Sequence, residues 1–131
     1  RIIKILKNKI KNKIITFLGV TFKANTDDMR ESSSLKMIPF LNKKGAHVKY
    51  YDPTGIKAEF NNLNNVEFKN NIQDACRFSD LIIIHTEWNE FKLIDLKKIV
   101  KKKNFIIFDL RNLYSVDKMK KEKIKYFCIG K

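Results

Sequence analysis

The sequence predicts an α/β fold of the Rossmann-like, doubly wound class, with a mostly parallel sheet and helices on both faces. Two observations predict it. Residues 81–84 and 105–108 are continuous apolar runs, which are typical of strands buried on both faces of a parallel sheet. The segments between such runs carry helix signals, so that strands and helices alternate along the chain.

Six segments are predicted as strands. The first ends at Gly19 and the second at the pair Asp52 and Pro53, and these residue types favour turns. The third is short and is expected at an edge of the sheet. In chain order, the strands are predicted over residues 14–18, 47–51, 66–68, 81–84, 105–108 and 125–129.

Helices are predicted over residues 34–44, 71–78 and 93–100. The first of them has serine N-cap candidates at residues 32–34 and ends at Gly45, because serine favours helix starts and glycine favours helix ends. Pro39 lies inside this helix and removes one of its backbone hydrogen bonds.

Residues 1–13 form a basic segment in which Ile2, Ile3, Leu6 and Ile10 recur at helical spacing. Such a helix can lie on a membrane surface or can end a linker from an upstream domain. We favour the linker, because the chain begins abruptly at Arg1 inside this segment. Residues 14–131 are then expected to form one domain.

Length and composition limit the class of protein. A chain of 131 residues with 44% hydrophobic residues can bury a core, which excludes a disordered tail. No apolar run approaches the roughly 18 residues that cross a bilayer. The two cysteines, Cys76 and Cys128, are too few for a disulfide framework. They are predicted as core residues of a reduced, cytoplasmic protein.

The net charge of +14 is concentrated in three clusters, at residues 1–13, 97–103 and 118–125. Two of these clusters fall where helices are expected to end, and cations there complement the helix dipole. We therefore favour a solvated surface, and expect neither a nucleic-acid nor a membrane partner. A basic nucleic-acid-binding module remains the alternative from another class of function.

Polar residues follow three predicted strands at the point where each ends, and ligands bind at such carboxyl ends in α/β sheets. Lys23 and Arg30 follow the first strand, and Arg111 follows the fifth. Only four arginines occur in this lysine-rich chain, so an arginine marks a place where its planar fork matters. These three cations are predicted to meet at a phosphate-bearing ligand. Arg30 has a second interpretation, as an internal partner of Asp27 or Asp28.

A dinucleotide site of the chain's own is not predicted. The glycine-rich turn that lets backbone reach a pyrophosphate is missing, because no second glycine follows Gly19 until Gly45. Asp52 stands at the end of the second strand, where a ribose-binding acid would lie, and is interpreted as a turn or cap residue.

Residues 17–35 resemble the opening of the C-terminal domain of nucleotide-sugar dehydrogenases, and their Asn-Thr-Asp-Asp-Met-Arg-Glu sequence is similar to the UDP-glucose 6-dehydrogenase branch. Further matches follow in the same order along the chain, at residues 45–48, 51–53, 86–91 and 109–112.

This resemblance implies a domain that binds the UDP part of a sugar nucleotide. It assigns Lys23 to the diphosphate, Phe22 and Arg111 to UDP, and Arg30 to NAD held mainly by a missing N-terminal domain. It also implies that the chain's partners are the enzyme's own N-terminal and central domains, and that the full-length enzyme is a homodimer. UDP-N-acetylmannosamine and GDP-mannose dehydrogenases are the near alternatives.

The resemblance also implies what the chain lacks. In this family UDP-glucose is oxidised twice through a thiohemiacetal on a cysteine in an upstream motif, which neither cysteine of this chain matches. We therefore expect the chain alone to be inactive, and an interaction domain using residues 1–13 stays open. Ala24 stands where the family often has proline, and Leu110 where it usually has glycine, so Leu110 is expected to crowd the nucleotide. His47 and Trp88 are interpreted as structural, and His85 is expected at the cleft edge.

Overall fold

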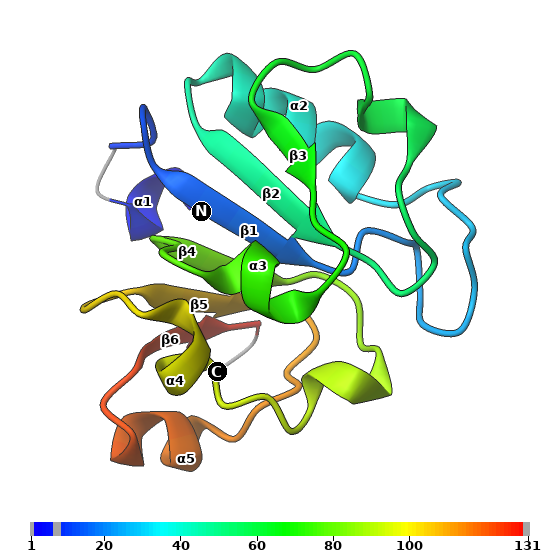
Figure 1. Cartoon of the computed structure of the whole chain (residues 1–131). Helices are drawn as coiled ribbons and strands as arrows, with labels where there is room; N and C mark the ends of the chain where they lie inside the picture. Colours follow the sequence, from blue (N-terminus) through cyan, green and yellow to red (C-terminus); the bar gives the residue numbers. More distant parts are fainter. Residues whose placement is uncertain (1, 7–8, 130–131) are drawn as a thin grey trace.

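The chain folds around one six-stranded sheet, as a computed structural model of residues 2–6 and 9–129 shows (Figure 1). All strand pairs are parallel, in the spatial order β3-β2-β1-β4-β5-β6. The predicted Rossmann-like fold is therefore confirmed, with a sheet that is parallel throughout. The strands are β1 (Ile14–Leu18), β2 (His47–Tyr51), β3 (Val66–Phe68), β4 (Leu81–Ile84), β5 (Ile106–Asp109) and β6 (Lys125–Cys128).

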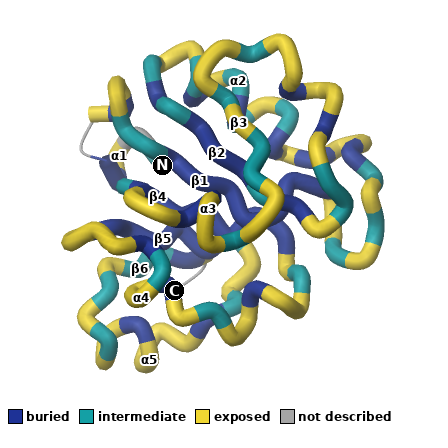
Figure 2. Tube along the Cα trace, viewed as in Figure 1, coloured by how far each residue is buried: buried dark blue, intermediate teal, exposed yellow. Residues whose placement is uncertain are grey.

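The order of the strands reverses between β1 and β4, which lie side by side in the middle of the sheet. Both are buried almost throughout, as the dark centre of Figure 2 shows. Leu18 pairs with Tyr51 on one side and Ile84 on the other, and Ile84 pairs with Asp109. Four strands thus end level with one another, so that their following loops share one edge of the sheet.

Helices cover both faces, as predicted. On one face, α1 (Ile2–Ile5) and α2 (Ser34–Lys43) pack their apolar residues against the strands. On the other face lie α3 (Ile72–Cys76), α4 (Leu96–Val100) and α5 (Val116–Lys121). Two short 3-10 turns, η1 (Ala58–Phe60) and η2 (Asn89–Phe91), lie in the loops after β2 and β4.

Four of the six strands have the predicted bounds, and the other two strands and the three predicted helices differ from them by one to three residues at one or both ends. The helix expected from residue 93 begins only at Leu96, because the Asp95 side chain caps it by accepting a hydrogen bond from the backbone of Lys98. Similarly, α5 begins after Ser115, whose hydroxyl accepts from the Lys118 amide. It had no predicted bounds, although its end coincides with one of the basic clusters.

The expected helix over residues 1–13 is wrong among the residues that the structure describes, because α1 ends at Ile5 and Asn12 is left-handed, with φ of 67°. Ile5, Leu6 and Ile10 are buried in the same apolar cluster as α2. Burial of these side chains against the domain therefore outweighs continuation of an exposed helix. Arg1 and residues 7–8 lie outside the described residues, and the linker remains a prediction.

The start of α2 shows the one feature of that helix that bears on function. Ser33 occupies the predicted N-cap position, but its side chain makes no capping bond. Its hydroxyl instead contacts His85 Nε2 at 2.9 Å. Pro39 is accommodated inside the helix, which stops as predicted before Gly45, with φ of 94°. The beginning of α2 is thereby joined to the loop after β4.

Candidate functional site

The candidate site lies where the loops after β1, β4 and β5 meet at the carboxyl edge of the sheet. The loop after β1 runs along the right-hand side of Figure 1. Arg111, in the loop after β5, joins all three: its Nε donates to the His85 carbonyl at 2.9 Å, and its Nη2 donates to the Phe22 carbonyl at 3.0 Å. The structure therefore brings together residues that are 89 positions apart in the sequence.

The two hydrogen bonds fix the Arg111 guanidinium without using all of its N–H donors. A guanidinium carries five N–H donors, and the two carbonyls take one each. The residue is exposed, so its other donors face solvent. Fixing an arginine through backbone carbonyls removes none of its positive charge, which leaves a preorganised fork for an anionic ligand.

A buried carboxylate fixes the loop that carries Arg111. Asp109 is fully buried at the end of β5. Its Oδ1 accepts from the Arg111 amide at 3.0 Å, while its Oδ2 accepts from the Tyr114 amide at 3.0 Å and the Tyr126 hydroxyl at 2.7 Å. Burial, together with the neighbouring Asp109, raises the pKa of Tyr126, so that this phenol stays a donor.

A second buried carboxylate fixes the loop after β1. Asp52 Oδ2 accepts from the amides of Val20 and Thr21 at 2.8 and 3.3 Å, and Oδ1 accepts from the amide and hydroxyl of Thr54. Its predicted role as a turn residue is confirmed by the bonds to Thr54. The bonds to the loop after β1 were not predicted, and they occupy the carboxylate that a dinucleotide ribose would need.

His85 links α2 to the loops after β1 and β4. The Thr86 hydroxyl donates to the Thr21 carbonyl at 2.9 Å, so it must accept from His85 Nδ1, which lies 3.0 Å away. The proton is then on Nδ1, and Nε2 accepts from Ser33. Burial, followed by the charge of Arg111, lowers the pKa of His85 to about 4. The ring is therefore a neutral structural bridge, buried behind the edge at which the sequence placed it.

Close packing at Gly19 completes this bridge. A Cβ atom at this residue would lie 2.5 Å from the Thr86 Cβ, and its φ is 80°. Both observations require glycine, because side chains disfavour that conformation and would collide with Thr86. The single glycine after β1 thus serves packing between two loops.

The predicted ligand residues Phe22 and Lys23 lie in the loop that Arg111 contacts. Phe22 is 44% exposed, similar to Phe40 at 43%. Its amide donates to the Asp28 carbonyl at 3.0 Å, and the Thr21 hydroxyl donates to the Lys23 carbonyl at 3.0 Å. Lys23 is exposed, and the structure links this loop to Arg111 through the Phe22 carbonyl, so the predicted meeting of the Lys23 ammonium with Arg111 at one ligand stays a prediction.

Arg30 makes the internal pair that the sequence offered as its second interpretation. Its Nε and Nη2 donate to the two carboxylate oxygens of Asp28 at 3.1 and 3.2 Å. Hydrogen bonding to Arg30 lowers the pKa of the Asp28 carboxyl. The Arg30 side chain is 88% exposed, and ion pairs at such exposed positions are weak. Its contact with a cofactor stays a prediction.

The structure shows the packing of four further residues that the sequence singled out. Leu110 packs against the apolar cluster that contains Phe17. Trp88 packs against the cluster on the opposite face, although its buried Nε1 has no hydrogen-bond partner among residues 2–6 and 9–129. Cys76 and Cys128 are buried, and burial raises the pKa of the Cys76 thiol to about 12. These findings confirm the structural interpretation of Trp88 and both cysteines.

His47 lies at the start of β2, at the other end of the strands, where its Nε2 contacts Glu67 Oε1 at 2.6 Å. Among the described residues, no group of three or more His, Cys, Asp or Glu side chains could hold a metal ion. No helix in the described part of the chain is long and apolar enough to cross a membrane.

The arrangement of strands, loops and cations agrees with one protein family. Residues 16–116 match the UDP-glucose/GDP-mannose dehydrogenase family, UDP binding domain. The chain belongs to this family. The match begins inside β1 and ends at the start of α5, so it includes every loop of the candidate site.

Curated relatives extend the family match over nearly the whole chain. A UDP-glucose 6-dehydrogenase of Rickettsia conorii is 37% identical over 133 residues, covering 99% of this chain and 31% of that protein. The UDP-glucose 6-dehydrogenase TuaD of Bacillus subtilis is 37% identical over 124 residues, covering 93% of this chain and 27% of its own. The chain thus spans less than a third of the length of these relatives.

Solved structures of the family share the fold. An NDP-N-acetyl-D-galactosaminuronic acid dehydrogenase of Methanosarcina mazei superimposes with a TM-score of 0.82 at 25% identity, over 98% of this chain and 27% of that one. The UDP-N-acetyl-mannosamine dehydrogenase Cap5O of Staphylococcus aureus gives a TM-score of 0.71 at 27% identity, over 97% and 28%.

The neutral His85 predicts a pH dependence of stability. Its pKa in the folded chain, about 4, lies below the ordinary histidine value of 6.5, so the unfolded chain binds a proton between these values that the folded chain does not. The free energy of unfolding is therefore expected to be highest above pH 6.5. It should fall by about 3 kcal/mol as the pH falls toward 4. Urea unfolding at pH 7.5 and 4.5 measures this change. His85→Gln should reduce this change, and an equal change in the unaltered chain and in His85→Gln would contradict the prediction.

The hydrogen bonds that Asp52 accepts predict that Asp52→Asn destabilises the fold. Asp52→Asn places an amide NH₂ or a neutral oxygen where the Val20 and Thr21 amides now donate to a charged one. We expect the free energy of unfolding to fall by about 1–3 kcal/mol, as urea titration would show. Asp27→Asn, at an exposed acid of the same loop, is the matched control and should change it by less than about 0.5 kcal/mol.

Proposed function

We propose that this chain is the UDP-sugar-binding part of an NAD-dependent UDP-glucose 6-dehydrogenase, which forms UDP-glucuronate from UDP-glucose. The observation that carries the proposal is the Arg111 guanidinium, held between the His85 and Phe22 carbonyls with donors left over. The identity of 37% to proteins named UDP-glucose 6-dehydrogenase supports the choice of sugar.

The carboxyl edge of the sheet is proposed to bind the diphosphate of the substrate. A guanidinium matches two phosphate oxygens at once, whereas an ammonium acts as a mobile point charge. Arg111 therefore fixes the orientation of the diphosphate and Lys23 adds charge beside it. Phe22, which is 44% exposed, offers an apolar surface to the nucleoside. Holding one end of the substrate rigidly positions its sugar for reaction elsewhere in the full-length enzyme.

NAD is proposed to bind mainly outside this chain. The residues present do not fit a dinucleotide site of their own, since the turn after β1 has Gly19 alone and the Asp52 carboxylate already accepts four hydrogen bonds. Arg30 is the residue proposed to reach the cofactor, by exchanging its exposed pair with Asp28 for a phosphate of NAD.

A second candidate keeps the same site and changes the sugar. Among the solved structures, the family members at 25% and 27% identity are dehydrogenases of N-acetylated sugar nucleotides. The higher identity to UDP-glucose 6-dehydrogenases favours UDP-glucose. Competition between UDP-glucose and UDP-N-acetylmannosamine, measured on the full-length enzyme as the ratio of their kcat/KM values, separates the two candidates.

The proposed phosphate clamp predicts a measurable affinity for UDP. Isothermal titration calorimetry of the chain with UDP should give weak binding, and either Lys23→Ala or Arg111→Ala should weaken it about tenfold or more. Arg111→Lys should bind UDP more weakly than the unchanged chain, because an ammonium lacks the planar fork that matches two phosphate oxygens at once. The control Lys36→Ala, on exposed α2, should leave the affinity unchanged. Unchanged affinity in both site variants would remove the assignment.

The chain alone is predicted to have no dehydrogenase activity. Both cysteines are buried, and burial raises the pKa of Cys76 to about 12, so Cys76 supplies no reactive thiolate at neutral pH. Incubation with UDP-glucose and NAD should give no increase in NADH absorbance beyond a no-protein control. Turnover by the purified chain would overturn this prediction.

A further inference from the structure

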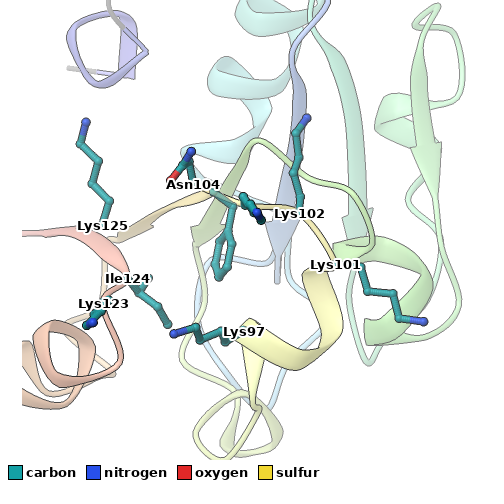
Figure 3. A pocket seen from close by; sticks show the side chains of 9 residues that line it. Lys97, Lys101, Lys102, Asn104, Lys123, Ile124 and Lys125 are labelled. Atoms are coloured by element: carbon teal, nitrogen blue, oxygen red, sulfur yellow. The ribbon is translucent and has the colours of Figure 1, made fainter.

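A second concentration of charge lies at the opposite edge of the sheet, where the strands begin. A hollow of about 500 Å³ opens there between the segment after α4 and the turn between α5 and β6 (Figure 3). It lies just before β5 and β6, whereas Arg111 follows the end of β5. The hollow is lined by Lys97, Lys101, Lys102, Lys103, Asn104, Phe105, Lys123, Ile124 and Lys125.

The fold brings together basic clusters that are separate in the sequence. Two of the three clusters, at residues 97–103 and 118–125, supply the six lysines of this hollow. An adjoining hollow of about 210 Å³ shares Asn104 and Lys125 with it and adds Lys13 from the first cluster, together with the acid Asp80. All three clusters therefore contribute to one edge of the molecule.

Little negative charge balances these lysines. No Asp or Glu is among the residues that line the larger hollow. Lys102 pairs with the carboxylate of Asp80. Lys97 Nζ donates at 2.7 Å to the Glu122 backbone carbonyl, an acceptor without net charge. Several side chains diverge in Figure 3, with Lys101 and Lys125 extending away from the others, as repulsion between like charges favours. The edge therefore has a large positive potential that an anion would relieve.

The backbone supplies an independent observation. Lys101 and Lys123 follow the ends of α4 and α5 with φ of 54° and 60°, a conformation that favours glycine or asparagine. Of the nine described non-glycine residues with positive φ, five are asparagine. Lysine at these two positions is costly for the backbone, and both side chains line the same hollow.

We infer that this edge binds a compact, multiply phosphorylated anion. A volume of about 500 Å³ falls within the range of small-molecule sites. Flexible ammonium groups suit clustered phosphates, because they need no fixed geometry. A single-stranded nucleic acid fits less well, since base stacking needs an exposed aromatic ring and Phe105 is only 6% exposed. This site is independent of the UDP site proposed above.

Calorimetric titration of the chain with sodium tripolyphosphate at 150 mM NaCl tests the inference. We expect one tripolyphosphate to bind at this edge, in addition to any that the proposed Arg111 clamp binds, and weaker binding of pyrophosphate and then orthophosphate as the ligand loses charge. The triple variant Lys103→Gln, Lys123→Asn, Lys125→Gln should weaken the binding of tripolyphosphate about tenfold or more. Asparagine is chosen at position 123 because it accepts the left-handed backbone, and the melting temperature of the variant verifies its folding.

A matched variant removes the same number of charges elsewhere. Lys36→Gln, Lys43→Gln and Lys44→Gln lie on exposed positions of α2 and at its end, and should leave tripolyphosphate binding unchanged. Equal loss in both triple variants would overturn the site, since it would show a response to net charge alone. Unchanged affinity in the first triple variant would overturn it too.

Two further titrations keep the sites apart. Arg111→Ala removes the proposed diphosphate clamp and should still bind one tripolyphosphate per chain, and the triple variant at the amino edge should not weaken UDP binding, so that failure of one proposal leaves the other standing. Loss of all tripolyphosphate binding in Arg111→Ala would assign that anion to the carboxyl edge and overturn the inference. Tighter binding of a 12-base-pair duplex than of tripolyphosphate would also overturn it in favour of a nucleic-acid surface.

Discussion

The register of β1 between its two neighbours determines where the candidate site lies. Leu18 is paired with Tyr51 and Ile84, so the loops after β1, β2 and β4 begin at the same level. A loop of one strand can then bond to the loops of the next. A shift of one residue would move each buried side chain to the other face of the sheet, and the polar residues of these loops would no longer meet.

Two buried carboxylates, Asp52 and Asp109, convert that register into a fixed arrangement of loops. Each accepts backbone amide hydrogens from residues beyond its own strand, and such bonds to a charged acceptor are among the stronger ones in proteins. The positive groups of this edge therefore lie on loops whose backbone is fixed by hydrogen bonds to these two carboxylates. The amino edge is organised in the opposite way, because its lysines have few acidic partners and splay into solvent (Figure 3).

The sequence predicted what depends on short-range patterns. Apolar runs located the strands, and the strand-end rule selected Lys23 and Arg111, which lie in loops that share a hydrogen bond through Phe22. It did not predict the contacts of Asp52 with the loop after β1, because nothing local to residue 52 shows which amides lie near it. The short α1 shows the opposite case, in which a local pattern was followed too far. Helical spacing over residues 1–13 predicted a helix, but packing of Ile5 and Ile10 in the core outweighs it.

Gly19 and Gly55 differ in which substitutions their surroundings would allow as the sequence diverges. At Gly55 a Cβ atom would meet nothing within 4 Å, whereas at Gly19 it would collide with Thr86. Asparagine could replace the former with only its backbone preference to satisfy, as it does at five other left-handed positions of the described chain. Position 19 has no such freedom unless Thr86 also becomes smaller, so these two residues are expected to vary together if they vary at all.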